Sequence, residues 1–439
     1  MNENHKMNVW QLTILTAVNM MGSGIIMLPS NLAEFGGISI VSWLVTAVGS
    51  MCLAYAFSKC GMFSKKSGGM TGYAEYSFGK AGNFLCNYVY SVSILVSNVA
   101  IAISAVGYGC TFFCIELTPI MTCVYTIFVI WLTTVFNFWG PEITGRISGV
   151  TVWGVLIPIF TISTVGWFFF SGDMYVSNWN IHDLPFSEAA LNSITMTLWA
   201  FLGLESACVN ADAVENPEKS VPFAVMGGTL GCAVVYILST NVMFGILPAA
   251  EISASSAPFG LAFATMFGPI IGKTVMGLMC VACLGSLFGW QFTGANMYKG
   301  AAEFGFYPKI FAKVTSKGAP VIGMIIAGSI QTGLALMTIS PSLNKQFEAL
   351  VNLAVILNVI PYFLCMAAMV VIMKAAGHGS PGELRLPRIA AFIGSVYTLY
   401  ACWSAGMDAM TYGSLLAFFG WTLYGFVSDR FDLQNYINE

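Results

Sequence analysis

Charged residues are scarce in this chain of 439 residues. Asp, Glu, Lys and Arg make up only 8% of it, whereas a soluble globular domain contains about 25%. Hydrophobic residues make up 57%. A composition this apolar excludes a soluble domain and predicts a chain that crosses a lipid bilayer several times.

Histidine is also scarce, and familiar catalytic motifs are missing. The three histidines, His5, His182 and His378, fall outside the apolar segments. Those segments contain no HExxH, no paired aspartates and no GxSxG, and the chain has no P-loop for ATP. No filter loop or ring of like charge points to an ion channel. These absences disfavour an intramembrane enzyme, a primary pump and a channel. We therefore expect a secondary carrier with no cofactor, no metal and no nucleic-acid partner.

Apolar segments of about 20 residues, long enough to cross the hydrocarbon, recur along the whole chain. The predicted spans are 10–33, 38–60, 82–112, 120–138, 147–171, 188–210, 222–247, 270–300, 319–339, 347–374, 386–406 and 408–427. Runs of this length indicate an all-α polytopic membrane protein and not a β-barrel. No linker is long enough to separate a soluble domain, so we treat residues 1–439 as one transmembrane domain.

Basic residues are distributed asymmetrically between the loops. If the N-terminus is cytoplasmic, all but two of the 17 basic residues, Lys273 and Lys345, fall on the cytoplasmic side. The opposite loops carry acidic residues with almost no compensating base. Because cytoplasmic loops are enriched in Lys and Arg, we expect both termini to be cytoplasmic.

Glycine interrupts the first span at Gly22, Ser23 and Gly24. Unwinding there would free backbone N–H groups at the start of a second half-helix, which suits an anion such as an α-carboxylate. Asn19, on the preceding turn, adds a polar side chain to the same neighbourhood. The alternative, favoured about equally by this motif alone, is that small residues only permit close helix packing.

A second interruption lies in the sixth span, where Gly203 stands between Trp199 and Glu205. A carboxylate in hydrocarbon costs on the order of 2.5–3.5 kcal/mol, so we expect Glu205 to face a polar cavity. Freed carbonyls at 201–204 would attract an ammonium group, and Trp199 offers a π face. The alternatives are that Glu205 caps the second half-helix and that Trp199 only packs.

Two interrupted spans in corresponding halves of a chain are typical of a transporter's substrate site. They predict an inverted repeat of approximately 10–171 against 188–374, with 386–427 appended. Span 1 and span 6 would then be the discontinuous helices of the two repeats.

Other residues are candidates for the same cavity. Trp290 lies mid-span among glycines, whereas Trp43 and Trp131 lie near span ends and are expected in the interfacial belt. Glu75, close to several tyrosines, would give an acidic, aromatic mouth suited to an amine, or it is an ordinary solvated acid. Asn98, in the middle of the third span, either bonds a neighbouring helix or lines the cavity.

Several motifs resemble one known family. Asn19–Pro29, Trp199–Ser206, Glu215–Pro217 and Gly289–Gln291 resemble the amino acid–polyamine–organocation superfamily, and within it the basic amino acid/polyamine antiporters. The resemblance runs essentially end to end. It implies a LeuT-like fold of twelve helices with a five-plus-five inverted repeat and discontinuous helices 1 and 6. It also implies a homodimer in the bacterial inner membrane.

The resemblance further implies roles for individual residues. A substrate carboxylate would bind at Ser23 and Gly24, and the α-amino group at the span 6 break. The substrate side chain would stack on Trp199, Trp290 would close the path on one side, and Glu205 would sense a proton or a cation. The other positions that match the family are Asn19, Glu75, Tyr90, Asn98, Cys208 and Tyr424.

The function implied is exchange of an amino acid for its decarboxylated amine, with ornithine and putrescine as the favoured pair. Such exchange would be coupled to a cytoplasmic decarboxylase, and the same cavity would also import putrescine with a proton. Lysine–cadaverine, histidine–histamine and tyrosine–tyramine are the alternative pairs. A membrane receptor that transports nothing is the alternative from another class.

Overall fold

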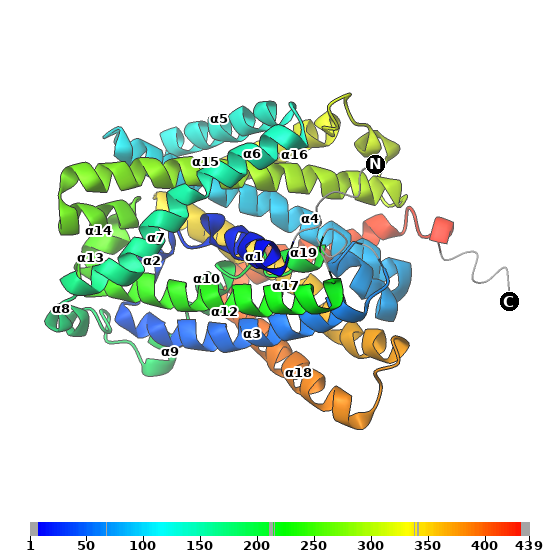
Figure 1. The fold of residues 1–439 in the computed structure, drawn as a ribbon. Helices are drawn as coiled ribbons and strands as arrows, with labels where there is room; N and C mark the ends of the chain where they lie inside the picture. The colour runs from blue at the N-terminus through cyan, green and yellow to red at the C-terminus, as the bar shows by residue number, and fades with distance from the viewer. Residues whose placement is uncertain are drawn as a thin grey trace.

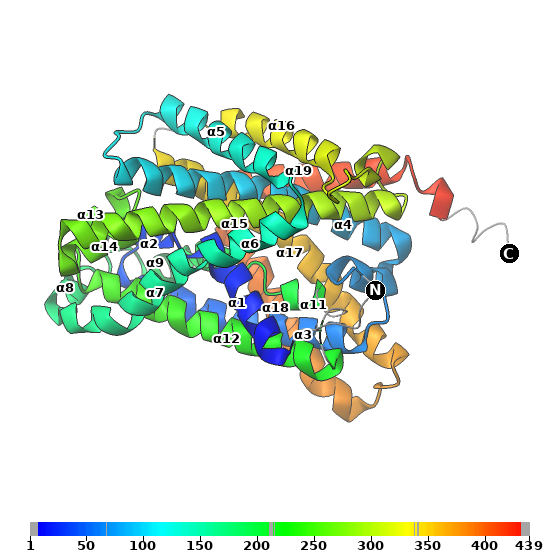
Figure 2. The same cartoon turned by 45° about the horizontal axis from the view of Figure 1, so that its top comes forward.

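The computed structural model describes residues 8–66, 68–209, 214, 216–337, 339 and 342–431. Figure 1 shows a helical bundle whose long helices share one general direction, and Figure 2 shows it turned. The elements of the first half are α1 (Val9–Gly24), α2 (Leu28–Leu32), η1 (Gly37–Ser39), α3 (Ile40–Phe63), α4 (Met70–Phe112), α5 (Pro119–Asn137), α6 (Pro141–Thr151), α7 (Trp153–Val165), η2 (Gly166–Phe169) and α8 (Gly172–Ser177). Those of the second half are α9 (Phe186–Leu191), α10 (Ile194–Trp199), α11 (Ser206–Val209), α12 (Pro217–Phe244), α13 (Ala249–Ala254), α14 (Pro258–Phe267), α15 (Pro269–Glu303), η4 (Lys309–Ala312), α16 (Val321–Met337), α17 (Leu343–Ala375), α18 (Pro381–Ser404) and α19 (Met407–Tyr424).

The two ends of the bundle hold different segments. Helices α2, α8, α13 and α14 lie at the left end of Figure 1, where Ser30 Oγ donates to the Ser255 carbonyl at 2.8 Å. The first turns of α4 and the last turns of α15 lie at the right end. Phe306 there packs against Phe431, with ring centroids 5.1 Å apart.

Seven helices of the described chain are long and apolar enough to cross a membrane, and the pair α18 and α19, bent by 115°, passes the same test together. Three shorter apolar helices, Val9–Met21, Pro258–Phe267 and Val321–Met337, accompany them. The chain is thus a multi-pass helical protein, as expected. Helix α4 consists of two helical segments that meet at a kink at Gly79, and the third predicted span, 82–112, lies in the second segment.

The first predicted interruption is present, but it lies just after the glycines. Helix α1 continues through Gly24, and the turn occupies residues 25–27 before α2 begins at Leu28. Pro29 accounts for this position, because a proline has no N–H and its ring clashes with the carbonyl four residues earlier, here that of Ile25. Proline therefore sets the break more directly than the glycines do.

The second interruption lies where the sequence predicted it. Helix α10 ends at Trp199, residues 200–205 form turns, and α11 begins at Ser206. Gly203 has φ +103°, a conformation that L side chains rarely adopt. The chain can therefore turn here only because residue 203 is a glycine.

The two breaks pack directly on each other. A Cβ atom placed on Gly24 would lie 3.0 Å from Ala200 Cα, and one on Gly203 would lie 3.2 Å from the Asn19 carbonyl oxygen. Small residues at both positions let the last turns of α1 meet the unwound backbone of the second break. The packing and functional interpretations of these glycines are therefore compatible.

One tryptophan expected in the interfacial belt, Trp43, is instead packed inside the protein, whereas Trp131 is half-buried. Trp43 is fully buried, and its ring lies 5.6 Å from that of Tyr236 and 6.3 Å from that of Phe201 in the second break. Trp131 Nε1 donates to Thr332 Oγ1 at 3.0 Å and so joins α5 to α16. The prediction for Trp43 was wrong because a position near a span end does not reveal which side of the helix faces lipid, whereas that for Trp131 stays a prediction.

Candidate substrate site

A small chamber lies where the two breaks meet. Its volume is about 40 Å³, room for about three water molecules. The residues predicted from sequence that line it are Asn19, Gly24, Tyr90, Trp199, Gly203, Glu205 and Trp290. The chamber thus gathers side chains from α1, α4, the second break and α15.

Glu205 is the acid of this chamber. It is only 1% exposed, yet its carboxylate is well provided with hydrogen-bond donors. Tyr90 Oη donates to Oε1 at 2.7 Å, Tyr362 Oη donates to Oε2 at 2.8 Å, and the Gly203 N–H donates to Oε2 at 3.2 Å. Three donors on one side chain suit the ionised carboxylate, because a protonated acid would compete with one of them. The Glu205 side chain is therefore held in place by donors from α4, α17 and the second break.

Trp199 forms an aromatic wall of the same chamber. It is buried, and its ring meets that of Phe347 edge to face at 6.3 Å between centroids. Among the described residues, its indole Nε1 has no hydrogen-bond partner. A π face beside a carboxylate is suited to an alkylammonium ion.

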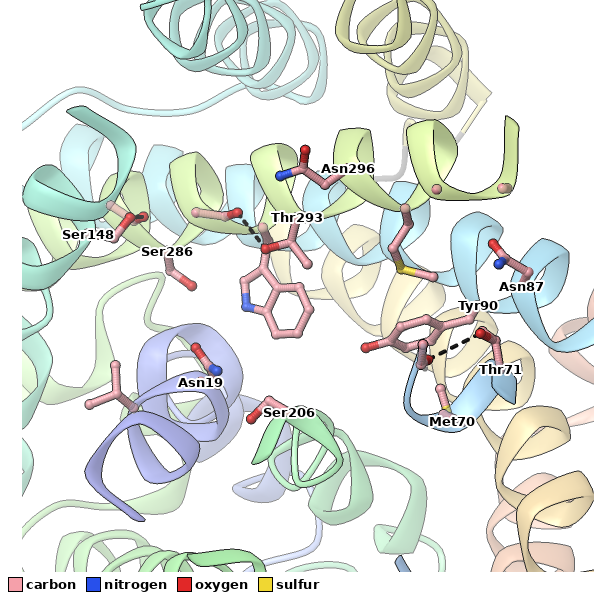
Figure 3. A pocket seen from close by; sticks show the side chains of 18 of the residues that line it. Asn19, Met70, Thr71, Asn87, Tyr90, Ser148, Ser206, Ser286, Thr293 and Asn296 are labelled. Carbon is pink, nitrogen blue, oxygen red and sulfur yellow. Dashed lines mark hydrogen bonds between the residues drawn. The ribbon is translucent and has the colours of Figure 1, made fainter. Parts of the chain in front are cut away.

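A larger cavity of about 460 Å³, called here the vestibule, adjoins the chamber and extends to the first turn of α4 and the last turns of α15. Figure 3 shows Asn19 and Ser206 on one side and Ser286, Thr293 and Asn296 on the other. None of its described lining residues is charged. The vestibule is therefore an uncharged, mainly apolar cavity with a few polar side chains on its walls.

Three residues line both spaces and so separate them. They are Asn19 of α1, Tyr90 of α4 and Trp290 of α15. Because Tyr90 also bonds Glu205, anything that moves from the vestibule into the chamber passes a side chain tied to its acid. Tyr90 therefore links the boundary between the two spaces to Glu205.

The Glu75 carboxylate is already bonded by neighbouring side chains. Its Oε1 lies 2.8 Å from Lys66 Nζ and 2.9 Å from Lys80 Nζ, and its Oε2 accepts from Asn83 Nδ2 at 2.6 Å. It lines neither the chamber nor the vestibule, although Thr71, one turn before it, does line the vestibule. An amine at Glu75 would have to compete with two lysines.

The remaining predicted residues lie apart from the chamber. Asn98 faces a separate small void between α4, α5, α15 and α16. The Cys208 thiol lies 3.5 Å from the Phe57 carbonyl oxygen, and the ring of Tyr424 packs 5.2 Å from that of Phe84. The Ser23 side chain lies outside the described part of the structure.

Comparison with known proteins identifies the family. The amino acid permease family matches residues 7–427 of this chain. The chain belongs to the amino acid permease family. The expected resemblance is confirmed, and so is a transporter rather than an enzyme.

Individual relatives of this permease are similar over nearly the whole chain. The putrescine transporter PotE of Haemophilus influenzae is 63% identical over 432 residues, 98% of this chain and 99% of that protein. The putrescine transporter PotE of Escherichia coli is 60% identical over 433 residues, 99% of this chain and 98% of that protein. A cadaverine/lysine antiporter of Escherichia coli is 35% identical over 368 residues, 83% of each chain.

Sequence reasoning missed two residues of this permease's site, both on α17. Tyr362 donates to Glu205, and Asn358, which lines the chamber, donates to Ser93 Oγ. Pro361, between them inside an otherwise regular helix, was the available signal, because an internal proline disrupts the backbone hydrogen bonds of a helix. The contacts themselves join residues 157 and 265 positions apart, beyond the reach of a local pattern.

Proposed function

We propose that this permease exchanges putrescine for ornithine across a bacterial inner membrane. The observation that carries the proposal is the buried Glu205 carboxylate, which lines a chamber between two helix breaks. Similarity to two putrescine transporters supports the amine. Similarity to an antiporter named for a diamine and its parent amino acid supports exchange with the precursor.

Binding would use chemistry that the chamber offers. One ammonium of putrescine would lie near Tyr90 and Glu205, with the alkyl chain against Trp199 and Trp290 closing the path. The α-carboxylate of ornithine would bind at Gly24 and the neighbouring Ser23. A chamber of about 40 Å³ is small for a four-carbon diamine, so the chain would reach into the vestibule or widen the chamber by moving Trp290.

Other candidate residues would act outside the chamber. Glu75 would attract amines at the outer end of the vestibule, where a substrate ammonium competes with Lys66 and Lys80. Asn98, Cys208 and Tyr424, which line neither the chamber nor the vestibule, would affect transport through helix packing.

The proposed topology has twelve spans. The pairs α1 with α2, α6 with α7, and α10 with α11 would each form one span, and α18 and α19 would each cross separately. Both termini would be cytoplasmic, with an inverted repeat of approximately 10–171 and 188–374. The vestibule would then open to the cytoplasm, where an amino acid decarboxylase supplies putrescine.

The proposed exchange also moves charge across the membrane. Ornithine carries a net charge of about +1 and putrescine about +2 near neutral pH. One-for-one exchange therefore moves one positive charge outward in each cycle. Proton-coupled uptake of putrescine would use the same chamber, with Glu205 as the sensing acid. We also propose a homodimer.

Counterflow tests the proposed substrate pair. Proteoliposomes are loaded with ornithine, lysine, histidine or tyrosine, and labelled putrescine is added outside. We expect ornithine to accelerate labelled uptake far more than the others. Equal acceleration by lysine would favour the lysine–cadaverine pair, and no uptake under any loading would favour a receptor.

A further inference from the structure

A second polar cluster lies away from the chamber, where α4, α5, α15 and α16 meet. It surrounds a void of about 10 Å³ lined by Asn98, Thr134, Asn137, Gln291, Tyr298 and Gln331, among others. Asn98 is 2% exposed, Gln291 8% and Gln331 1%. With Asn137, which is fully buried, four amides surround one void and require a hydrogen-bonding explanation.

Part of the cluster is satisfied within the protein. Gln291 Nε2 donates to the Ile130 carbonyl at 3.2 Å and to Gln331 Oε1 at 3.4 Å. Asn137 Nδ2 donates to the Phe288 carbonyl at 3.0 Å, and its Oδ1 accepts from Thr144 Oγ1 at 2.8 Å. These bonds join α5 to α6 and to α15, and α15 to α16.

Three atoms of the cluster remain unsatisfied among the described residues. They are Asn98 Oδ1, Gln291 Oε1 and Gln331 Nε2. Two are acceptors and one is a donor. Exchanging the O and N atoms of the Gln331 amide would not satisfy these atoms. The Gln331 NH2 group would then face the Gln291 NH2 group, and the hydrogen bond between the two side chains would be lost.

We propose that Asn98, Gln291 and Gln331 bind one ordered water molecule in this void. Water can donate to the two oxygens and accept from the Gln331 NH2 group, which matches the three unsatisfied atoms. The void is at the lower limit of the volume that one water needs, and it offers the usual number of polar partners. A sodium ion fits less well, because the NH2 hydrogens of Gln331 repel a cation.

The water makes the four helices one unit. Asn98 shares α4 with Tyr90, and Gln291 directly follows Trp290 on α15. The bound water therefore fixes the two helices that carry the aromatic side chains between the vestibule and the chamber. Gln331 is a positioning residue for Trp290. This consequence rests on the proposed function, whereas the water site itself does not.

A density map at about 2 Å resolution of the full-length protein in lipid nanodiscs tests the site directly. We expect a single peak within hydrogen-bond distance of all three unsatisfied atoms, unchanged when sodium is replaced by choline. A dry void with rearranged amides overturns the proposal. So does a peak with shorter, ion-like distances that disappears without sodium.

A double-mutant cycle tests whether one water joins the residues. Asn98→Ala and Gln331→Leu are made singly and together, with Ser329→Ala on an exposed face of α16 as the control. If both variants remove the same water, the double variant lowers the thermal midpoint by less than the sum of the single shifts. Additive shifts contradict a shared water. If a variant fails to fold, the density map of the unaltered protein still decides.

Putrescine binding tests the positioning role separately. We expect the single variant Gln331→Leu to bind putrescine more weakly than the unaltered protein does. Adding Gln331→Leu to a protein that already carries Trp290→Leu should weaken binding no further. An equal loss in both backgrounds means that Gln331 acts without Trp290. If the unaltered protein binds no putrescine, the proposed function is contradicted. The water site is then still tested by the density map.

Discussion

Replacing Glu205 with glutamine removes the charge of the chamber while nearly keeping its shape. The carboxylate now accepts from Tyr90, Tyr362 and the Gly203 N–H. Glutamine keeps one oxygen and gains an NH2 donor, so one tyrosine hydroxyl must turn and accept instead. Because side-chain volume and most of the contacts remain, we expect the variant to fold and insert.

The loss of putrescine affinity should be large. At a separation of about 5 Å and an effective dielectric constant of about 20, a carboxylate and an ammonium attract each other by about 3 kcal/mol. That energy corresponds to roughly a hundredfold change in Kd. Since no described residue of the chamber or vestibule lining other than Glu205 carries a charge, no neighbour replaces the lost attraction.

The assay is binding of radiolabelled putrescine to purified protein by scintillation proximity. Glu251→Gln makes the same chemical change at an exposed acid on α13 and should leave Kd within about twofold. Thermal unfolding and size-exclusion chromatography check that both variants are folded. A Kd for Glu205→Gln within about threefold of the unaltered protein would refute the role of this carboxylate.

Three further predictions use the same binding and transport assays. Trp199→Leu should weaken putrescine binding about two- to thirtyfold, which is the contribution of a cation–π contact. The control Trp403→Leu changes an exposed residue of α18 and should leave binding unchanged; equal effects would make Trp199 a packing residue. Gly24→Val should abolish transport of both substrates because even a Cβ there lies 3.0 Å from Ala200 Cα; normal transport would show that the breaks separate freely. Glu75→Gln should slow putrescine uptake at low ionic strength, because it leaves the charges of Lys66 and Lys80 uncompensated against an approaching amine. The loss should be smaller in about 0.5 M salt, which screens that repulsion; a salt-independent loss would contradict a role of charge.

Much of the chamber could be predicted because its signals are local in sequence. A carboxylate, an indole and a glycine within one apolar span already indicate a polar cavity, and the structure brings Glu205, Trp199 and Gly203 together. The exact position of the first break was harder to predict from the sequence. Glycine permits unwinding, but Pro29 removes the hydrogen bond that would extend the helix past Ile25.

The remaining differences depend on tertiary packing. Trp43 near a span end could face lipid or protein, and only the approach of Tyr236 and Phe201 makes it a core residue. Tyr362 could not be linked to Glu205 without knowing that α17 lies beside the second break. Asn98 was expected either to bond a neighbouring helix or to line the cavity, and which void it faces depends on the rotation of α4.

The most direct test of one-for-one exchange is to follow both substrates in the same proteoliposomes. Vesicles are loaded with one label on putrescine and supplied outside with a second label on ornithine. We predict equal amounts of putrescine released and ornithine taken up, with release almost stopped when ornithine is omitted or Glu205→Gln is used. Putrescine that leaves equally fast without external ornithine, or through the Glu205→Gln protein, would contradict exchange at this chamber.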